Sequence, residues 1–117
     1  MKRSAPAVGL QTFKAEFFKA LAHPVRIRIL ETLVAGERSV HELQDTLGLD
    51  QPTVSQQLAV LRAKNIVEAR KEGTGVRYAV RDASLREFLD AARRIFDNQL
   101  IGTQAMLREL RREARRR

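Results

Sequence analysis

The sequence predicts a small, mainly α-helical domain that carries one short β-hairpin. Three observations support this fold class. Apolar residues recur at helical spacing over most of the chain, two short alternating segments flank a glycine-rich turn, and a long apolar stripe runs through the last third. With 117 residues the chain fits one domain. We expect a flexible N-terminal segment at residues 1–9, the domain at 10–112 and a basic tail at 113–117.

The first two predicted helices meet at a histidine–proline pair. The first helix, from about residue 10 to residue 22, has apolar residues three and four positions apart: Leu10, Phe13, Phe17 and Leu21. Pro24 suits the first turn of a helix and disfavours helical backbone at the residue before it. A second helix therefore runs from Pro24 to about Gly36, and His23 is expected to cap or pack at the junction.

A helix-turn-helix unit is predicted between residues 39 and 64. Ser39 and Glu42 have the spacing of a capping box, which places a short helix at about Val40–Leu47, and Gly48 ends it. Asp50 then suits the N-cap of another helix that ends near residue 65. Two helices joined by such a turn allow the second one to enter the major groove of DNA.

The second helix of this unit has one apolar and one polar side. If Val54, Leu58 and Leu61 are buried, Gln56 points almost directly outward. An amide can donate to and accept from an adenine edge, and hydroxyls bond bases or phosphates. We expect base contacts from Ser55, Gln56 and Gln57, and backbone contacts from Gln51 and Thr53. The same residues also fit a solvated helix face, but the neighbouring helix, turn and hairpin favour DNA binding.

A β-hairpin follows at residues 66–81. Two segments of alternating apolar and charged residues flank the turn Glu72–Gly75, and basic residues lie on both sides of it. Such a wing can lie along a phosphate backbone or in the minor groove, although a hairpin that only closes the core remains an alternative. The candidate DNA contacts after residue 61 are Arg62, Arg70, Lys71, Thr74, Arg77 and Tyr78.

The last predicted helix is longer than one small domain can cover. Ser84 and Glu87 resemble a capping box, and a mostly apolar stripe follows over roughly 25 residues, or close to 40 Å. A partner chain is therefore expected. The Arg-rich tail suits either a disordered basic segment or the solvated end of this helix.

Composition excludes several classes of function. Twenty-two Lys and Arg residues against 14 Asp and Glu give a net charge of +8, which favours a polyanionic partner, although half of this excess lies in the tail. No cysteine is present, so disulfides and thiolate metal sites are excluded. No catalytic set, phosphate-binding glycine loop, cofactor motif, membrane-spanning run or secretory signal is recognisable, so we expect a cytoplasmic protein that is not an enzyme and holds no cofactor.

Three segments, ALAHPVRIRILETL, SVHELQDTLGLDQPTVSQQLAVLRAKNIV and EARKEGTGVRYAV, occur in the order and spacing of one family. From about Phe13 to Ala92 the chain resembles the ArsR/SmtB family of bacterial winged helix-turn-helix repressors. The resemblance implies a recognition helix at about Gln51–Lys64, a wing at Glu72–Gly75, and a homodimer on an imperfect inverted repeat of double-stranded DNA. It also implies an interface of the first and last helices, and the candidates are Phe13, Phe17, Leu89, Phe96, Leu100 and Leu107.

The chain departs from the metal-sensing members of that family. It has no cysteine in the segment VHELQD and no histidine in the last helix, so we expect no metal site of the usual kind. A small organic molecule, a metal site formed across the dimer, a protein partner and no effector at all remain open, as do the operator sequence and the regulated genes. The alternative functions are a winged-helix protein-interaction module and a membrane-surface binder; the Gln, Ser and Thr face beside a basic wing favours DNA.

Overall fold

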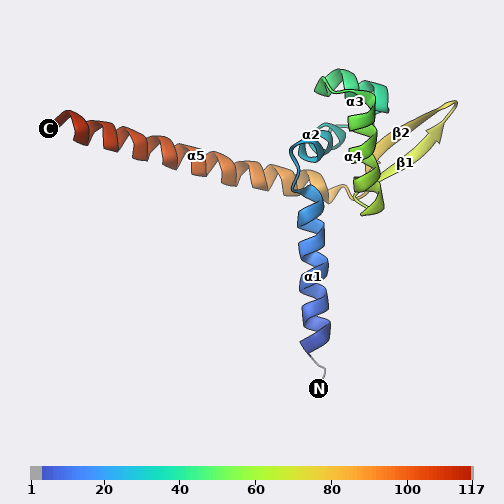
Figure 1. Ribbon diagram of the computed structural model, residues 1–117, viewed down its shortest axis with the longest axis horizontal. Helices are drawn as coiled ribbons and strands as arrows, with labels where there is room; N and C mark the ends of the chain where they lie inside the picture. The colour runs from blue at the N-terminus through green and yellow to red at the C-terminus, as the bar shows by residue number, and fades with distance from the viewer. Residues whose placement is uncertain (1–3, 117) are drawn as a thin grey trace. The chain divides into compact units, whose positions relative to one another are not determined.

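The computed structural model describes residues 4–116, which form five α-helices and one antiparallel hairpin (Figure 1). In chain order the elements are α1 (Ser4–Leu21), α2 (Pro24–Leu33), α3 (Val40–Leu47), α4 (Gln51–Ala63), β1 (Val67–Glu72), β2 (Gly75–Val80) and α5 (Ser84–Arg116). The chain divides into two compact units, one ending at Ala83 and one beginning at Ser84. The predicted mainly α-helical fold with a small hairpin is confirmed.

The core of the first unit is built from apolar residues of α2, α3, α4 and β1. Its fully buried side chains are Ile29, Leu30, Leu33, Leu43, Val54, Leu58, Leu61 and Val67. The three residues contributed by α4 are those of the predicted apolar stripe, and no described side chain with a charge or polar group is buried with them. The polar face of α4 therefore lies on the side away from this core.

Helix α1 begins earlier than the sequence indicated. Residues 4–9 were expected to be flexible, yet the helix starts at Ser4, while residues 1–3 lie outside the described part of the chain. Pro6 falls in the first turn, where a missing N–H leaves no helix hydrogen bond unmade. At the other end, Nδ1 of His23 accepts a hydrogen bond from the backbone N–H of Val25 (3.1 Å), which confirms its capping role at the start of α2.

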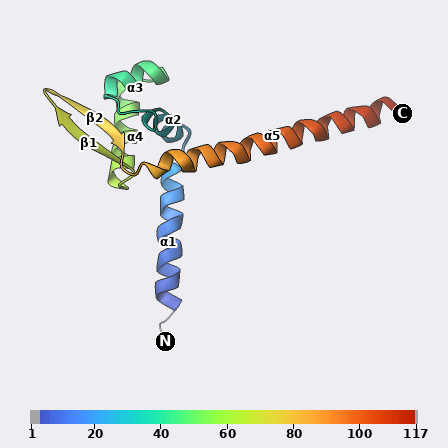
Figure 2. The ribbon, with the colours of Figure 1, turned by 180° about the vertical axis from the view of Figure 1, so that it is seen from behind.

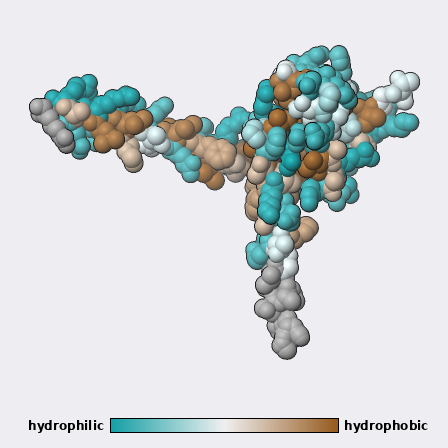
Figure 3. Space-filling model, viewed as in Figure 1, coloured by the Kyte–Doolittle hydropathy of each residue, from teal (hydrophilic) through white to brown (hydrophobic). Residues whose placement is uncertain are grey.

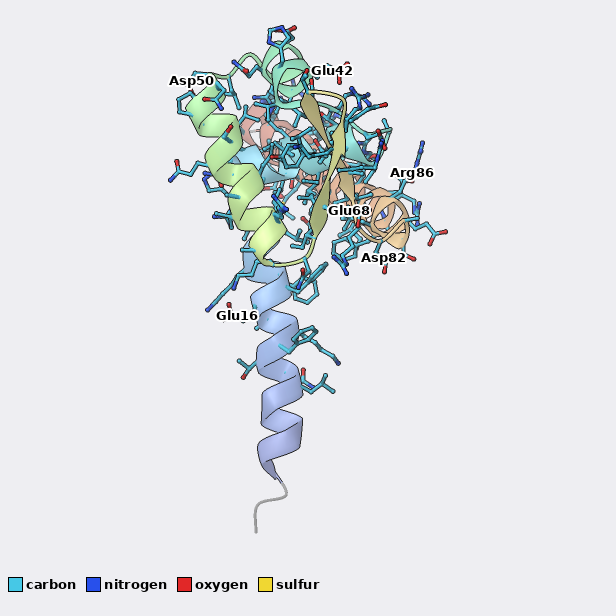
Figure 4. All side chains as sticks on the ribbon, turned by 90° about the vertical axis from the view of Figure 1, so that its right-hand side faces the viewer. Glu16, Glu42, Asp50, Glu68, Asp82 and Arg86 are labelled. Carbon is cyan, nitrogen blue, oxygen red and sulfur yellow. The ribbon has the colours of Figure 1, made fainter. Side chains whose placement is uncertain are left out.

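The helix-turn-helix unit is held by its caps. Ser39 and Glu42 form both bonds of the predicted capping box of α3, and Gly48 ends that helix with φ 68°, in the left-handed region that glycine adopts without strain. Asp50 caps α4, accepting a hydrogen bond from the backbone N–H of Thr53 (2.9 Å). Figure 4 labels Asp50 at this end of α4. The boundaries of α3 match the prediction.

Helix α4 ends at Ala63, two residues before the expected end, in a Schellman motif. The backbone N–H of Ile66 donates to the carbonyl of Leu61 (3.0 Å), and that of Asn65 donates to the carbonyl of Arg62 (3.0 Å). Asn65 has φ 61° and is the only described residue other than glycine with a positive φ. The buried Ile66 and Leu61 give the motif its usual apolar contact and lead the chain directly into β1.

The hairpin closes with a two-residue turn, because Glu72 pairs with Gly75 and leaves Gly73 and Thr74 between the strands (Figure 2). Gly73 has φ 62°, a conformation suited to glycine at the first central position of a hairpin turn. At its root, the backbone of Tyr78 in β2 exchanges two hydrogen bonds with that of Arg38 (3.0 and 2.7 Å). The hairpin is thus tied to the segment that precedes α3.

Helix α5 has 33 residues and, at about 1.5 Å per residue, is about 50 Å long. It continues through residues 113–116, so the described part of the Arg-rich tail is the end of this helix, which was one of the two interpretations of the tail. An ion pair between Glu109 and Arg112 (3.1 Å) lies on its last turns. Apolar side chains are exposed along it, including Phe96 (59 %) and Leu100 (62 %), and Figure 3 shows them beside hydrophilic residues. None of the described helices is long and apolar enough to cross a membrane.

Candidate nucleic-acid interface

The outer face of α4 carries the predicted base-reading side chains. Gln56 is exposed and makes no side-chain hydrogen bond within residues 4–116. Ser55 and Thr53 are half-buried on its two flanks, and Gln51 is exposed at the start of the helix. Nε2 of Gln51 donates to Oγ of Ser55 (2.7 Å). Because Oγ accepts in that bond, the Ser55 hydroxyl keeps its own proton to donate outward.

The N-terminal end of α4 is already occupied by a carboxylate. The hydrogen bonds from Thr53 hold the pKa of Asp50 below its ordinary value of 3.8. An ionised carboxylate at this end of a helix is also favoured by the helix dipole. One backbone N–H that might otherwise bind a phosphate therefore has an internal partner, so side chains are the main donors that α4 offers.

Three of the predicted contact residues line one open groove between α4 and β2. Ser55 and Arg62 border it from α4 and Tyr78 from β2, and the groove has a volume of about 440 Å³. The remaining lining residues are Leu58, Ala59 and Ala63. Two hydroxyls and one guanidinium around a shallow, partly apolar groove match the donors that phosphate and base edges require.

The tip of the wing is exposed and its charge is available. Lys71 and Thr74 are both exposed, and within residues 4–116 Lys71 takes part in no ion pair. An exposed lysine that no carboxylate pairs with is available to meet an anion.

The arginines of the wing are placed differently, against carboxylates. Nε of Arg77 lies 3.2 Å from Oε1 of Glu37, and its Nη2 donates to the Glu37 carbonyl (3.1 Å). Arg77 also pairs with Glu42 (3.2 Å) and Glu72 (3.6 Å), and Arg70 donates to the same Glu37 oxygen. We call these five residues the wing-root cluster. It joins β1 and β2 to α3 and to the segment before it.

Glu42 has two tasks in this cluster. Its Oε1 accepts the Ser39 backbone N–H (2.9 Å) and also lies against Nη1 of Arg77. The bond from Ser39 and, to a smaller degree, the charge of Arg77 lower the pKa of Glu42 below its ordinary value of 4.5. Figure 4 labels this residue on α3. The capping box of α3 is therefore also an attachment point of the wing.

Sequence reasoning missed Glu37 and two arginines of α2. Nε of Arg26 donates to Oε1 of Gln57 (2.8 Å), and Nη2 of Arg28 donates to the carbonyl of Leu47 at the end of α3 (3.1 Å). Their partners lie 31 and 19 positions away. No local spacing signals such contacts, because charged residues on a helix usually face solvent.

Residues 4–116 contain no group of three or more His, Cys, Asp and Glu side chains that is placed to hold a metal ion. His41 lies 3.6 Å from Asp45 on the exposed face of α3, and both side chains are largely solvated.

Comparisons with known proteins agree with this geometry. Residues 23–69 match the sequence model described as "Bacterial regulatory protein, arsR family". The HTH-type transcriptional regulator Rv0081 of Mycobacterium tuberculosis is 46 % identical over 103 residues, which are 87 % of this chain and 90 % of that protein. Its crystal structure has a TM-score of 0.74 over 80 % of this chain and 94 % of that one.

Two further relatives carry informative names. The biofilm growth-associated repressor of Xylella fastidiosa is 44 % identical over 85 residues, 73 % of this chain and 75 % of that protein. The solution structure of the homodimeric winged helix-turn-helix DNA-binding domain of Mb0332 from Mycobacterium bovis is 30 % identical, with a TM-score of 0.76 over 85 % of this chain and 92 % of that one.

Proposed function

The chain belongs to the ArsR family of bacterial regulatory proteins, and on this basis we propose that it represses transcription as a homodimer bound to an imperfect inverted repeat. That it is a DNA-binding transcriptional regulator of winged helix-turn-helix fold follows from its relatives, which are regulators and repressors rather than enzymes. The proposal concerns the assembly, the DNA site and the residues that contact it.

One observation carries the assignment of the contact surface: the outer face of α4 is polar, has the exposed Gln56 at its centre and forms no ion pair among the described residues. Gln56 stands at its centre with no partner among the described residues, and the Ser55 hydroxyl has a proton to donate. An α-helix with such a face fits the major groove, where amides and hydroxyls meet base edges. Gln56, Gln57 and Ser55 then contact bases, and Gln51 and Thr53 contact the backbone beside them.

Phosphate contacts in this proposal come from the flanks of α4. Arg62 and Tyr78 border the groove between α4 and the wing, and Lys71 and Thr74 lie exposed on the wing. Arg70 and Arg77 contribute less to phosphate binding, because carboxylates of the wing-root cluster already neutralise much of their charge. Their main task is to hold the wing against α3 and the segment before it.

The exposed apolar side chains of α1 and α5 support the homodimer. Phe13 is 73 % exposed on α1 and Phe96 is 59 % exposed on α5, which is unfavourable for a chain that stays alone in water. The homodimeric relative Mb0332 makes a second copy of this chain the natural partner. The proposed interface residues are the exposed Phe13, Phe17, Phe96, Leu100 and Leu107, together with Leu89, which is half-buried.

The test is a footprint of the full-length protein on the promoter of its own operon, combined with titrations at several salt concentrations. A dimer that contacts about six to ten phosphates loses roughly 10³- to 10⁵-fold in affinity between 50 and 200 mM salt. Protection of two half-sites about one helical turn apart is expected. A monomeric protein, or equal affinity for every duplex and for heparin, would contradict the proposal and favour a protein-interaction module.

A further inference from the structure

Arg26 bridges two helices of the DNA-binding unit from the start of α2. Its Nε donates to Oε1 of Gln57 on α4 (2.8 Å), and its Nη1 donates to the carbonyl of Ala20 in the last turn of α1 (3.2 Å). Both Arg26 and Gln57 are half-buried, so solvent competes only partly with these bonds. The guanidinium is therefore held at both ends, and its position is set before any DNA arrives.

This contact determines which way the Gln57 amide faces. A guanidinium has only donors, so the amide oxygen must turn toward Arg26; the reverse orientation would set an NH₂ group against an N–H. The oxygen then carries a charge-assisted bond, and the NH₂ group, which no residue within 4–116 accepts from, is left to donate elsewhere. Withdrawal of electron density by the guanidinium makes this NH₂ group a stronger donor.

Gln56, the next residue, has no such constraint. It is exposed and its amide makes no hydrogen bond within residues 4–116, so it can rotate to present its oxygen, its NH₂ group or both. Two neighbouring glutamines of α4 thus differ in their readiness to donate or accept. Arg26 on α2 causes this difference, so the sequence of α4 alone does not reveal it.

We propose that Arg26 is a specificity-determining positioning residue that makes Gln57 a hydrogen-bond donor toward DNA. The base opposite Gln57 then carries acceptors without a donor on its major-groove edge, which means O6 and N7 of guanine or O4 of thymine, whereas adenine places its N6 amino donor beside the N7 acceptor. The bidentate pairing of a free glutamine with adenine, which needs the amide oxygen as well, is disfavoured at this position. The inference rests on the proposed function, since it requires α4 to read DNA.

The experiment selects duplexes with the full-length protein from a library randomised over roughly 30 base pairs, about three helical turns. Affinities are then measured for all single-base changes in the selected site. The proteins compared are the wild type, Gln57→Ala, Gln57→Glu, Arg26→Met, Arg26→Lys and the control Gln56→Glu. Gln57→Ala identifies the base pair that Gln57 reads in each half-site. An abasic nucleotide placed in one strand or the other then identifies which of the two bases Gln57 contacts, and the base preference at this pair is scored on that strand.

At that base pair the wild type should prefer guanine or thymine by roughly fivefold or more. Arg26→Met should abolish most of this preference and leave the other positions unchanged, while Arg26→Lys, which keeps one charged donor, should restore part of it. Gln57→Glu places an acceptor toward the base, because Arg26 holds its other oxygen. The preference should therefore switch to cytosine or adenine, whose amino groups donate.

The change of base preference in Gln57→Glu should disappear when Arg26→Met is added to it. Gln56→Glu should weaken binding equally with and without Arg26→Met. A wild-type preference for adenine or cytosine at that base pair overturns the inference. So does an Arg26→Met protein whose affinity falls equally at every position. If Arg26→Met fails to fold, as judged by circular dichroism, Arg26→Lys and Gln57→Glu decide the matter. A wild type that selects no sequence removes the proposed function itself, and the two failures are distinct.

Discussion

Oε1 of Glu37 lies 3.2 Å from Nε of Arg77, although the two residues are 40 positions apart in the chain. The first precedes α3 and the second lies in β2, so this pair fixes the wing relative to the helix-turn-helix unit. Both side chains are partly exposed, which allows solvent and a nearby phosphate to compete for the arginine.

Replacing Glu37 should therefore change nucleic-acid binding in a specific direction. In Glu37→Gln, Arg70 and Arg77 lose a shared carboxylate and gain freedom to meet phosphate. We expect tighter binding to non-operator duplex and a salt dependence steeper by about one to two phosphate equivalents. The measurement is fluorescence anisotropy of a scrambled duplex at several salt concentrations.

Glu68→Gln is the matched control for that variant. It also removes one negative charge, from the hairpin whose arginines Glu37 contacts, but Glu68 has no ion pair among the described residues. Glu68→Gln should change the affinity for the scrambled duplex only slightly and leave the slope of its salt dependence unchanged. Equal slopes for the two variants would show that the wing-root cluster does not withhold its arginines from DNA.

Gln56→Ala should lower discrimination more than total affinity. One good base contact contributes about 1–3 kcal/mol of discrimination, so the ratio of operator to scrambled-duplex affinity should fall by roughly 5- to 100-fold. The affinity for scrambled duplex should change little, because the exposed Gln56 carries no charge. A ratio equal to that of the wild type would remove Gln56 from the base-reading set.

Lys71→Ala should show the opposite behaviour. Its ammonium group has no internal partner among the described residues, so its loss removes about one phosphate contact. Affinity should fall by a similar factor on every duplex, and the salt slope should become shallower by about 0.9 for each protomer, or about 1.8 for the proposed dimer. The same titrations as for Gln56→Ala provide the comparison, and an unchanged slope would place Lys71 away from the backbone.

The N-cap of α4 makes a testable contribution to acid stability. Because the pKa of Asp50 is lowered in the folded chain, its stabilising effect is fully present above the ordinary value of 3.8. This stabilisation is lost as the pH falls through the lowered pKa that Asp50 has in the folded chain. Asp50→Asn keeps a good cap without the charge, so it should lose this part of the pH dependence. Asp50→Ala should lower Tm by a few degrees even at pH 7.

Thermal unfolding followed by circular dichroism between pH 2.5 and 7 separates these effects. The pKa of Glu42 is also lowered in the folded chain, from its ordinary value of 4.5. Its contribution to acid stability is the same in the wild type, Asp50→Asn and Asp50→Ala, so it serves as an internal reference. If Asp50→Asn keeps the whole acid dependence of the wild type, the carboxylate of Asp50 does not stabilise the folded chain.

A charge on the apolar stripe of α5 should separate the proposed dimer. Leu100 is 62 % exposed, and in Leu100→Asp a carboxylate without a partner would have to be buried against the second copy. We expect the free energy of dimerisation to become less favourable by about 2 kcal/mol or more, which corresponds to a dimer Kd at least about 30-fold higher. Analytical ultracentrifugation gives this constant directly.

Asn98→Asp is the control, since two positions correspond to about 200° of rotation around the helix and place the new charge on the opposite side. It should leave the dimer intact. Dissociation by both variants alike would assign the effect to the net charge of α5 rather than to the stripe.

Local signals in the sequence predicted the helix-turn-helix unit closely. The limits of α3 follow from Ser39, Glu42 and Gly48, and each of these acts on backbone groups within three or four residues. The start of α1 was predicted too late, because Pro6 and Gly9 are typical of flexible segments, although a proline also suits the first turn of a helix. The end of α5 was left open between a disordered tail and a solvated helix end, because residues 111–116 have Ala114 as their only apolar residue but are rich in strong helix formers.

The contacts that orient the proposed interface were not predictable from the sequence. Glu37 with Arg77, and Arg26 with Gln57, join residues that only the tertiary fold brings together. A charged residue at such a position has no periodic or local signature. The sequence therefore indicated which side chains are available to DNA, and the structure adds which of them are already hydrogen-bonded.

The uncovered apolar stripe of α5 also affects how the thermal stability of this protein depends on its concentration. In the proposed assembly, folding and association are coupled, so dilution lowers Tm and a higher protein concentration raises it. In a cell that makes few copies, Tm would therefore be lower than in a concentrated preparation in the laboratory, and growth temperature would lie closer to it. The abundance of the protein thereby becomes one of the determinants of its own persistence.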